Sequence, residues 1–106
     1  MDEFLIELKK QKEKIQEIAD RIENQESYMG EMKEFLPELN RTITALFGMI
    51  QDSTLQIEIN QNFVLQVLND VLYGIEHEDS VFLEDVLRYG LIEVYDYIEI
   101  EIQREG

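Results

Sequence analysis

Residues 36–50, LPELNRTITALFGMI, place Leu36, Ile43 and Ile50 seven residues apart. The same spacing extends in both directions, and every seventh residue from Met1 to Val71 is apolar. Because 44% of the chain is hydrophobic, chance would produce this run in about one chain in 1,000. A repeat of this period keeps one face of a helix apolar. We predict that this seven-residue stripe forms the seam of an oligomer, with these members: Leu8, Ile15, Ile22, Met29, Leu36, Ile43, Ile50, Ile57, Val64 and Val71.

The stripe and the small number of turn residues, five glycines and one proline, predict an all-α fold. The expected architecture is a long-helix antiparallel bundle or a coiled coil with a shorter C-terminal helical segment. We expect a single helical domain over 1–106. It comprises an N-terminal amphipathic helix over 1–36, a second long helix over 38–76 and a C-terminal helical segment over 80–104. Glu17 and Arg21 have the i,i+4 spacing that stabilises the first helix.

The boundaries of these helices follow from a few residues. Pro37 suits the first turn of a helix, but the stripe continues through it, so we expect a kink or a very short break there. Asp79 or Ser80 is the expected N-cap of the C-terminal segment. Gly90 divides that segment into helices over about 80–89 and 91–104 in one interpretation.

Residues 51–62 are ambiguous, because Leu55, Ile57 and Ile59 alternate with polar residues as in a strand. We expect helix here, with polar layers at Thr54 and Gln61 that either set the register of a coiled coil or face water. Residues 98–102 also alternate, and a strand is the second interpretation of that segment.

Composition excludes several classes of function. The chain has no cysteine, so disulfides, thiolate metal sites and cysteine nucleophiles are absent. Its formal charge is −15, of which residues 51–106 carry 13 acids against Arg88 and Arg104, or −11. Such a field repels nucleic acid and anionic membranes, so neither is an expected partner. The first residues lack the features of a signal peptide, and no segment is apolar enough to span a membrane, so we expect a cytoplasmic protein.

No residue pattern predicts chemistry. The acidic cluster of Glu76, Glu78, Asp79, Glu84 and Asp85 lacks the glycine and the spacing of a calcium loop. His77 is the only imidazole and has no nucleophile at a recognisable spacing, and the acids Glu93, Asp96 and Glu99 are typical of a solvated helix face. We therefore expect no catalytic residue, no metal and no cofactor, and the chain is predicted not to be an enzyme.

Aromatic residues concentrate in the acidic half, and tyrosine is favoured at protein interfaces. We predict a surface that binds a basic or amphipathic helix of a protein partner, formed by Tyr73, Phe82, Tyr89, Tyr97, Glu84 and Asp85. A homo-oligomer is also expected, because a helix of about 40 residues is about 60 Å long and one short segment cannot cover its stripe. The alternatives are a purely structural coiled-coil oligomer and an acidic nucleic-acid mimic, whose acidic face Lys9, Lys10, Lys12 and Lys14 would interrupt.

Residues 67–102, with NDVL at 69–72, EHED at 76–79 and LEDVL at 83–87, resemble small uncharacterised helical proteins of Gram-positive bacteria. The general plan of long acidic amphipathic helices is similar to that of flagellar and type III export chaperones. The second resemblance implies a protein that shields an amphipathic helix of a client.

Overall fold

The computed structural model describes residues 2–105, with side chains up to Arg104. All regular structure in this range is helical: α1 (Asp2–Glu23), α2 (Met29–Gln51), α3 (Gln61–Glu76), α4 (Ser80–Val86), the π-helical turn η1 (Leu87–Leu91) and α5 (Ile92–Glu105). The prediction of an all-α chain is therefore confirmed, and the strand interpretations of 51–62 and 98–102 are wrong.

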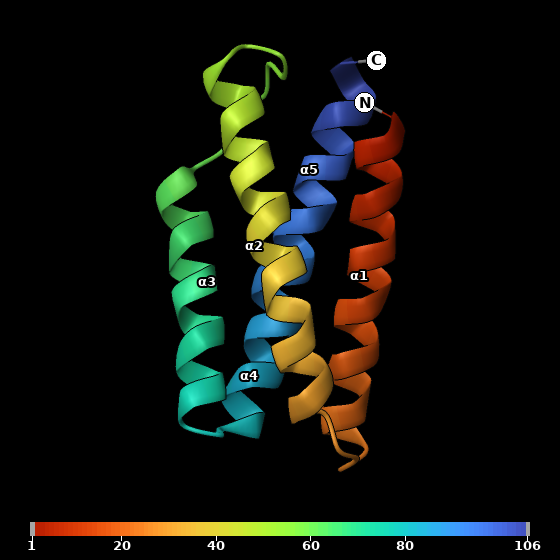
Figure 1. Ribbon diagram of the computed structural model, residues 1–106, viewed down its shortest axis with the longest axis vertical. Helices are drawn as coiled ribbons and strands as arrows, with labels where there is room; N and C mark the ends of the chain where they lie inside the picture. The colour runs from red at the N-terminus through yellow and green to blue at the C-terminus, as the bar shows by residue number, and fades with distance from the viewer. Residues whose placement is uncertain (1, 106) are drawn as a thin grey trace.

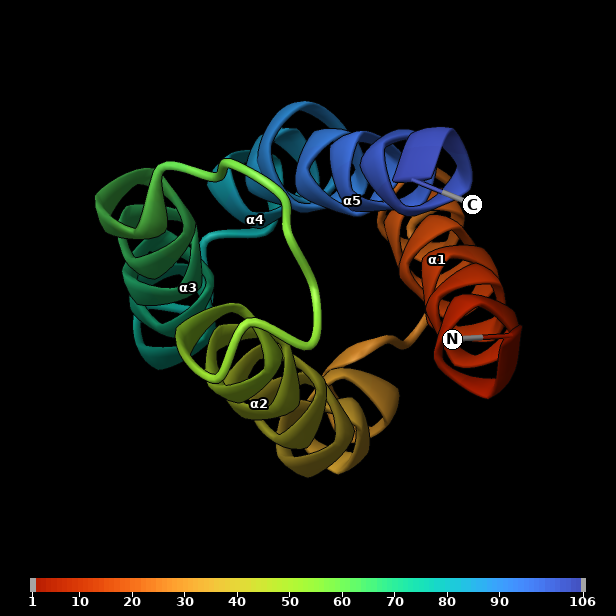
Figure 2. The same ribbon diagram turned by 90° about the horizontal axis from the view of Figure 1, so that it is seen from above.

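The helices lie side by side as four columns, because α4, η1 and α5 follow one another in a single column (Figure 1). The chain descends along α1, ascends along α2, descends along α3 and ascends again through α4 and α5 (Figure 1). Seen along the columns, they surround a common interior, with the last column between α3 and α1 (Figure 2). The last column packs against both α1 and α3, and the molecule measures 41 × 23 × 21 Å.

The first break in the chain lies at residues 24–28, and the predicted boundary at Pro37 is wrong. Gln25 adopts a left-handed conformation with φ of 59°, and the Glu26 amide donates to the Arg21 carbonyl. Pro37 instead lies exposed inside α2. Proline has no N–H, so α2 loses one hydrogen bond there while the ring faces solvent.

The predicted continuous helix over 38–76 is also wrong, since residues 52–60 form a loop between α2 and α3. Ser53 has a φ of 65°, and the Asn60 side chain caps α3 by accepting from the Phe63 amide. Leu55 and Ile57 are buried although they are not helical, and the loop curves over the interior at one end (Figure 2). The alternation thus marks an extended loop that closes the core.

Of the two alternatives for Thr54 and Gln61, the structure shows the second, in which both face water. Thr54 and Gln61 are both exposed, so neither forms a buried polar layer. A buried polar contact exists elsewhere: the Tyr95 hydroxyl donates to Gln11 Oε1 at 2.6 Å. Gln11 Nε2 in turn donates to Thr42 Oγ1 at 2.7 Å. Three helices, α5, α1 and α2, therefore meet at one hydrogen-bonded site in the core.

Asp79 caps α4 as predicted, because its side chain accepts from the Phe82 amide. The interpretation in which Gly90 divides the segment is wrong, since Gly90 lies within η1 and the backbone stays right-handed helical on both sides. A Cβ atom at Gly90 would lie 3.3 Å from Val67 Cγ1. The glycine thus allows α3 to approach the last column closely.

The seven-residue stripe is mostly the core of a single chain. The members that are 8% exposed or less are Leu8, Ile15, Ile22, Ile43, Ile57, Val64 and Val71. Met29, Leu36 and Ile50 are partly buried. The prediction that the stripe forms a seam between copies is therefore corrected. Most of its members are buried among the four columns of a single chain. The predicted helix of about 40 residues does not form, because the loop over 52–60 separates α2 from α3.

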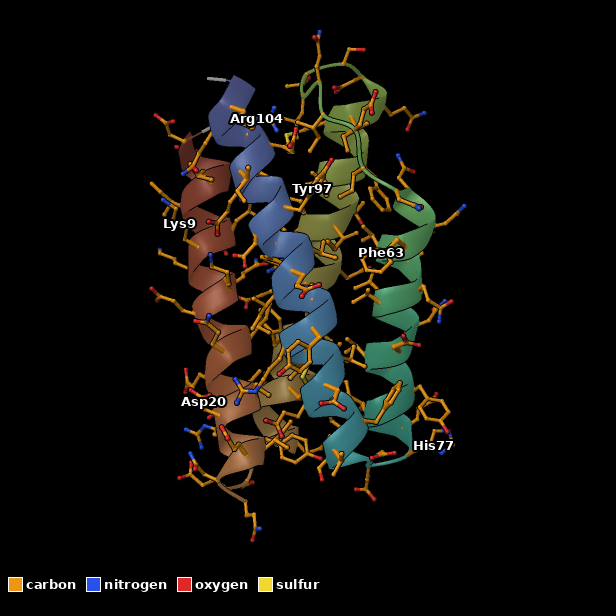
Figure 3. All side chains as sticks on the ribbon, turned by 180° about the vertical axis from the view of Figure 1, so that it is seen from behind. Lys9, Asp20, Phe63, His77, Tyr97 and Arg104 are labelled. Atoms are coloured by element: carbon orange, nitrogen blue, oxygen red, sulfur yellow. The ribbon has the colours of Figure 1, made fainter. Side chains whose placement is uncertain are left out.

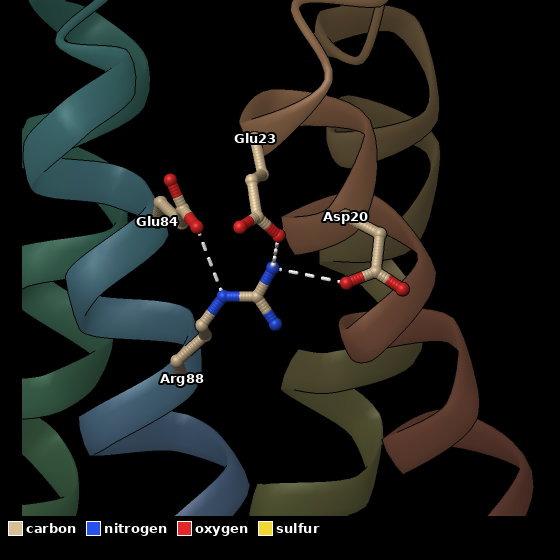
Figure 4. A network of polar contacts seen from close by, with 4 residues as sticks. All are labelled: Asp20, Glu23, Glu84 and Arg88. Atoms are coloured by element: carbon tan, nitrogen blue, oxygen red, sulfur yellow. Dashed lines mark hydrogen bonds and ion pairs between the residues drawn. The ribbon is translucent and has the colours of Figure 1, made fainter.

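Ion pairs tie α1 to its neighbours. Arg88 contacts Glu84 and Asp20 at 2.9 Å and Glu23 at 3.1 Å (Figure 4). Hydrogen bonds to Glu84 and Asp20 raise the pKa of Arg88. Asp20 and Glu23 are largely exposed, so solvent screening limits the stability these pairs add. The predicted Glu17–Arg21 pair forms at 3.6 Å.

Candidate protein-interaction groove

Two members of the acidic cluster near the α3–α4 turn, Asp79 and Glu84, have structural roles. Asp79 caps α4, Glu84 pairs with Arg88, and His77 lies exposed with its ring centroid 4.1 Å from that of Tyr73. Over residues 2–104, no group of three or more His, Asp or Glu side chains is arranged to hold a metal ion.

Two adjoining hollows lie between α3 and the column of α4, η1 and α5. The first, about 350 Å³, includes Phe63 and Val64 of α3, and Glu93, Val94 and Tyr97 of α5. The second, about 250 Å³, includes Phe63, Val67 and Asp70 of α3 on one wall, and Asp85, Val86, Tyr89 and Gly90 on the other. Phe63 belongs to both, so we treat them as one surface, the α3–α5 groove.

Three aromatic side chains of the α3–α5 groove are exposed to solvent. Phe63 is 50% exposed, Tyr89 68% and Tyr97 39%. Phe63 and Tyr97 lie on neighbouring columns of the same face (Figure 3). Tyr89 belongs to the π-helical turn, a local distortion that is frequent at functional sites. Exposed aromatic area of this kind gains free energy when a partner covers it.

Three carboxylates line the α3–α5 groove: Asp70, Asp85 and Glu93. Among residues 2–104, no ion pair involves Asp70, Asp85 or Glu93. Of the two bases in the C-terminal half, Arg88 faces the acids of α1 (Figure 4). Arg104 pairs with Glu101 at 3.2 Å. The groove therefore combines apolar walls with uncompensated negative charge.

The structure brings together half of the predicted partner-binding residues. Tyr89, Tyr97 and Asp85 line the α3–α5 groove. Tyr73 and Phe82 instead contact each other at the end of the bundle, with ring centroids 5.4 Å apart. Glu84 does not line the groove and is engaged by Arg88.

Sequence reasoning missed the α3 wall of the groove, which consists of Phe63, Val67 and Asp70, and also Glu93 on α5. Asn60, a favourable N-cap residue shortly before an apolar run, could have indicated that a new helix begins there and includes Phe63. Placing residues 38–76 in one helix concealed this helix start.

In the described part of the chain, no helix has the length and apolar character needed to cross a bilayer. Comparisons with protein-family models, curated proteins and solved structures find no match for this chain. The resemblances noted from the sequence therefore stay predictions.

Proposed function

We propose that this chain is a non-enzymatic binding module that holds a basic amphipathic helix of a partner protein in the α3–α5 groove. The observation that carries this proposal is the combination of exposed Phe63, Tyr89 and Tyr97 with carboxylates that form no ion pair among residues 2–104. An amphipathic helix binds by laying its apolar side chains into a groove between two helices. We also propose that the scaffold is an antiparallel bundle, which the opposite directions of neighbouring helices support (Figure 1).

The position of the charges supports a basic partner. Asp70 lies on the α3 wall, and Asp85 and Glu93 lie on the facing column. Lysine or arginine residues that flank the apolar face of a bound helix would meet a carboxylate on either side. The net charge of −15 would also speed the approach of a basic partner at low salt.

The test uses a synthetic amphipathic helix of about 20 residues with a leucine stripe flanked by lysines, which spans about 30 Å. A matched peptide with glutamates in place of the lysines serves as the control ligand. We expect saturable binding of the lysine peptide only, measured by isothermal titration calorimetry. Tyr89→Ala and the double variant Asp85→Lys/Glu93→Lys should each weaken it at least about tenfold, which is 1.4 kcal/mol.

The matched protein control is the pair Glu34→Lys and Glu38→Lys, which changes the net charge equally on α2, away from the groove. If these substitutions weaken binding as much as those in the groove, binding follows net charge alone and the proposal fails. Equal affinity for the glutamate peptide would also exclude it.

A further inference from the structure

The other side of α3 carries a third hollow, of different character. It lies between α2 and α3, has a volume of about 370 Å³, and its apolar lining is mainly five leucines: Leu36, Leu39, Leu65, Leu68 and Leu72. Leu65 is 47% exposed and Leu72 48%. We call this surface the α2–α3 face.

The α2–α3 face is uncharged in a strongly acidic protein. None of the residues that line its hollow is charged, whereas 31% of the whole chain is. The only polar side chains of the lining are Asn40 on α2 and Asn69 on α3. A partner recognised through charge finds nothing to bind here. A second copy, which itself carries −15, meets no like charge among the residues that line this hollow.

The face also contains both halves of a complementary contact. Leu65 and Leu72 project from α3 beside a hollow that accepts side chains of their size. A two-fold axis brings the same patch of two copies together, so each copy presents its own leucines to the hollow of the other. Asn40 and Asn69 can then hydrogen-bond across the axis, and a polar pair of this kind fixes register in helical interfaces.

We infer that the α2–α3 face is the contact between two copies of this chain, with α3 of each copy lying in the groove between α2 and α3 of the other. This contact is separate from the seven-residue stripe, most of which is already buried within one chain. It also leaves the α3–α5 groove on the opposite side of α3 free. Its test is therefore independent of the proposed function.

The experiment is light scattering coupled to size-exclusion chromatography on the full chain, over micromolar to millimolar concentrations and at two salt concentrations. We expect a mass of twice the 12.6 kDa of one chain, with the dimer favoured by salt because salt screens the repulsion between copies. Leu65→Glu/Leu72→Glu should give a monomer with unchanged helicity by circular dichroism, since both side chains are already half exposed.

Asn69→Asp adds one negative charge to each copy without changing shape, and should weaken the dimer at least fivefold in low salt. Tyr89→Glu, on the α3–α5 groove, is the matched control and should leave the dimer intact. A monomer at every concentration and salt would overturn the inference. So would a dimer that Tyr89→Glu dissociates and Leu65→Glu/Leu72→Glu does not. A monomer that binds a fluorescent fatty acid at this face would assign the hollow to a lipid ligand instead.

Discussion

Replacing Tyr95 by Phe removes one hydroxyl from the centre of the fold. Tyr95 is fully buried, and its hydroxyl donates to Gln11 Oε1 at 2.6 Å. The Gln11 amide nitrogen is already used, because it donates to Thr42 Oγ1 and to Glu7 Oε1. Without the hydroxyl, Gln11 Oε1 loses that donor in a residue that is only 4% exposed.

The cost follows from that unpaired acceptor. A buried polar group that loses its only partner costs about 1–3 kcal/mol. For a domain of this size, each kcal/mol lowers Tm by about 4–8 °C. We therefore expect Tyr95→Phe to lower Tm by about 8–16 °C, corresponding to about 2 kcal/mol, although the ring itself is retained.

The assay is urea unfolding followed by circular dichroism, with the free energy of unfolding compared among variants. The triple variant Tyr95→Phe/Gln11→Met/Thr42→Val removes the three buried polar side chains at once. It should recover most of the loss, because Glu7, the remaining partner of Gln11, is exposed to water. Thr44→Val, at an exposed position of α2, should change stability by less than about 0.5 kcal/mol. If Tyr95→Phe stays within about 0.5 kcal/mol of the parent, the buried hydrogen bond is not as described.

Three further predictions concern packing and charge. Gly74→Ala places a Cβ atom 3.1 Å from Leu83 Cβ and should lower stability by about 1–3 kcal/mol. Gly48→Ala, where a Cβ atom meets nothing within 4 Å, should instead raise stability by about 0.5–1 kcal/mol. Equal effects of the two substitutions in thermal melts would contradict the close α3–α4 contact. Burial raises the pKa of Tyr95 above its ordinary 10.0, so its contribution to stability is complete below pH 10 and is lost as pH rises above that value. Tyr95→Phe should consequently show a shallower loss of stability between pH 9.5 and 11.5 than the parent, and parallel curves would contradict this. Because the net charge is −15, raising NaCl from 20 to 300 mM should raise Tm. A falling Tm would show that attraction outweighs the repulsion, through the ion pairs of Arg88 and those of Lys12 with Asp96 at 2.8 Å and Glu99 at 3.2 Å.

The apolar pattern of the sequence predicted burial better than it predicted helix boundaries. Seven members of the stripe are buried, yet Ile57 reaches the core from a loop. A seven-residue spacing therefore continued through the turn at 24–28 and the loop at 52–60 without a continuous helix. The pattern records which side chains leave water, and several backbone paths satisfy it.

The true breaks carry weak sequence signals. Gln25 and Ser53 adopt left-handed conformations that the sequence does not mark with glycine. Pro37 is the most obvious breaker, but it lies inside a helix because its ring faces solvent and the missing N–H costs only one hydrogen bond. Asp79 was predictable, since its side chain forms a local bond to the Phe82 amide three residues on.

Only residues of the candidate site that lie within one helical column were predicted. Tyr89, Tyr97 and Asp85 belong to one helical column, so sequence spacing could place them near each other. Phe63 and Asp70 come from α3. They face the last column only because the chain reverses direction at the turn over 77–79. Contacts such as Arg88 with Asp20, 68 residues apart, depend on how columns pack and have no local signature.

The most direct test of the central claim, that the α3–α5 groove holds a basic amphipathic helix, is a map of peptide binding by nuclear magnetic resonance. The ¹⁵N-labelled chain is titrated with the unlabelled lysine-flanked peptide, and the shift of each backbone amide is followed. We expect saturable shifts concentrated at Phe63, Val67 and Asp70 and across residues 85–97. Shifts that concentrate on α1 or on the α2–α3 face, or that never saturate, would contradict it.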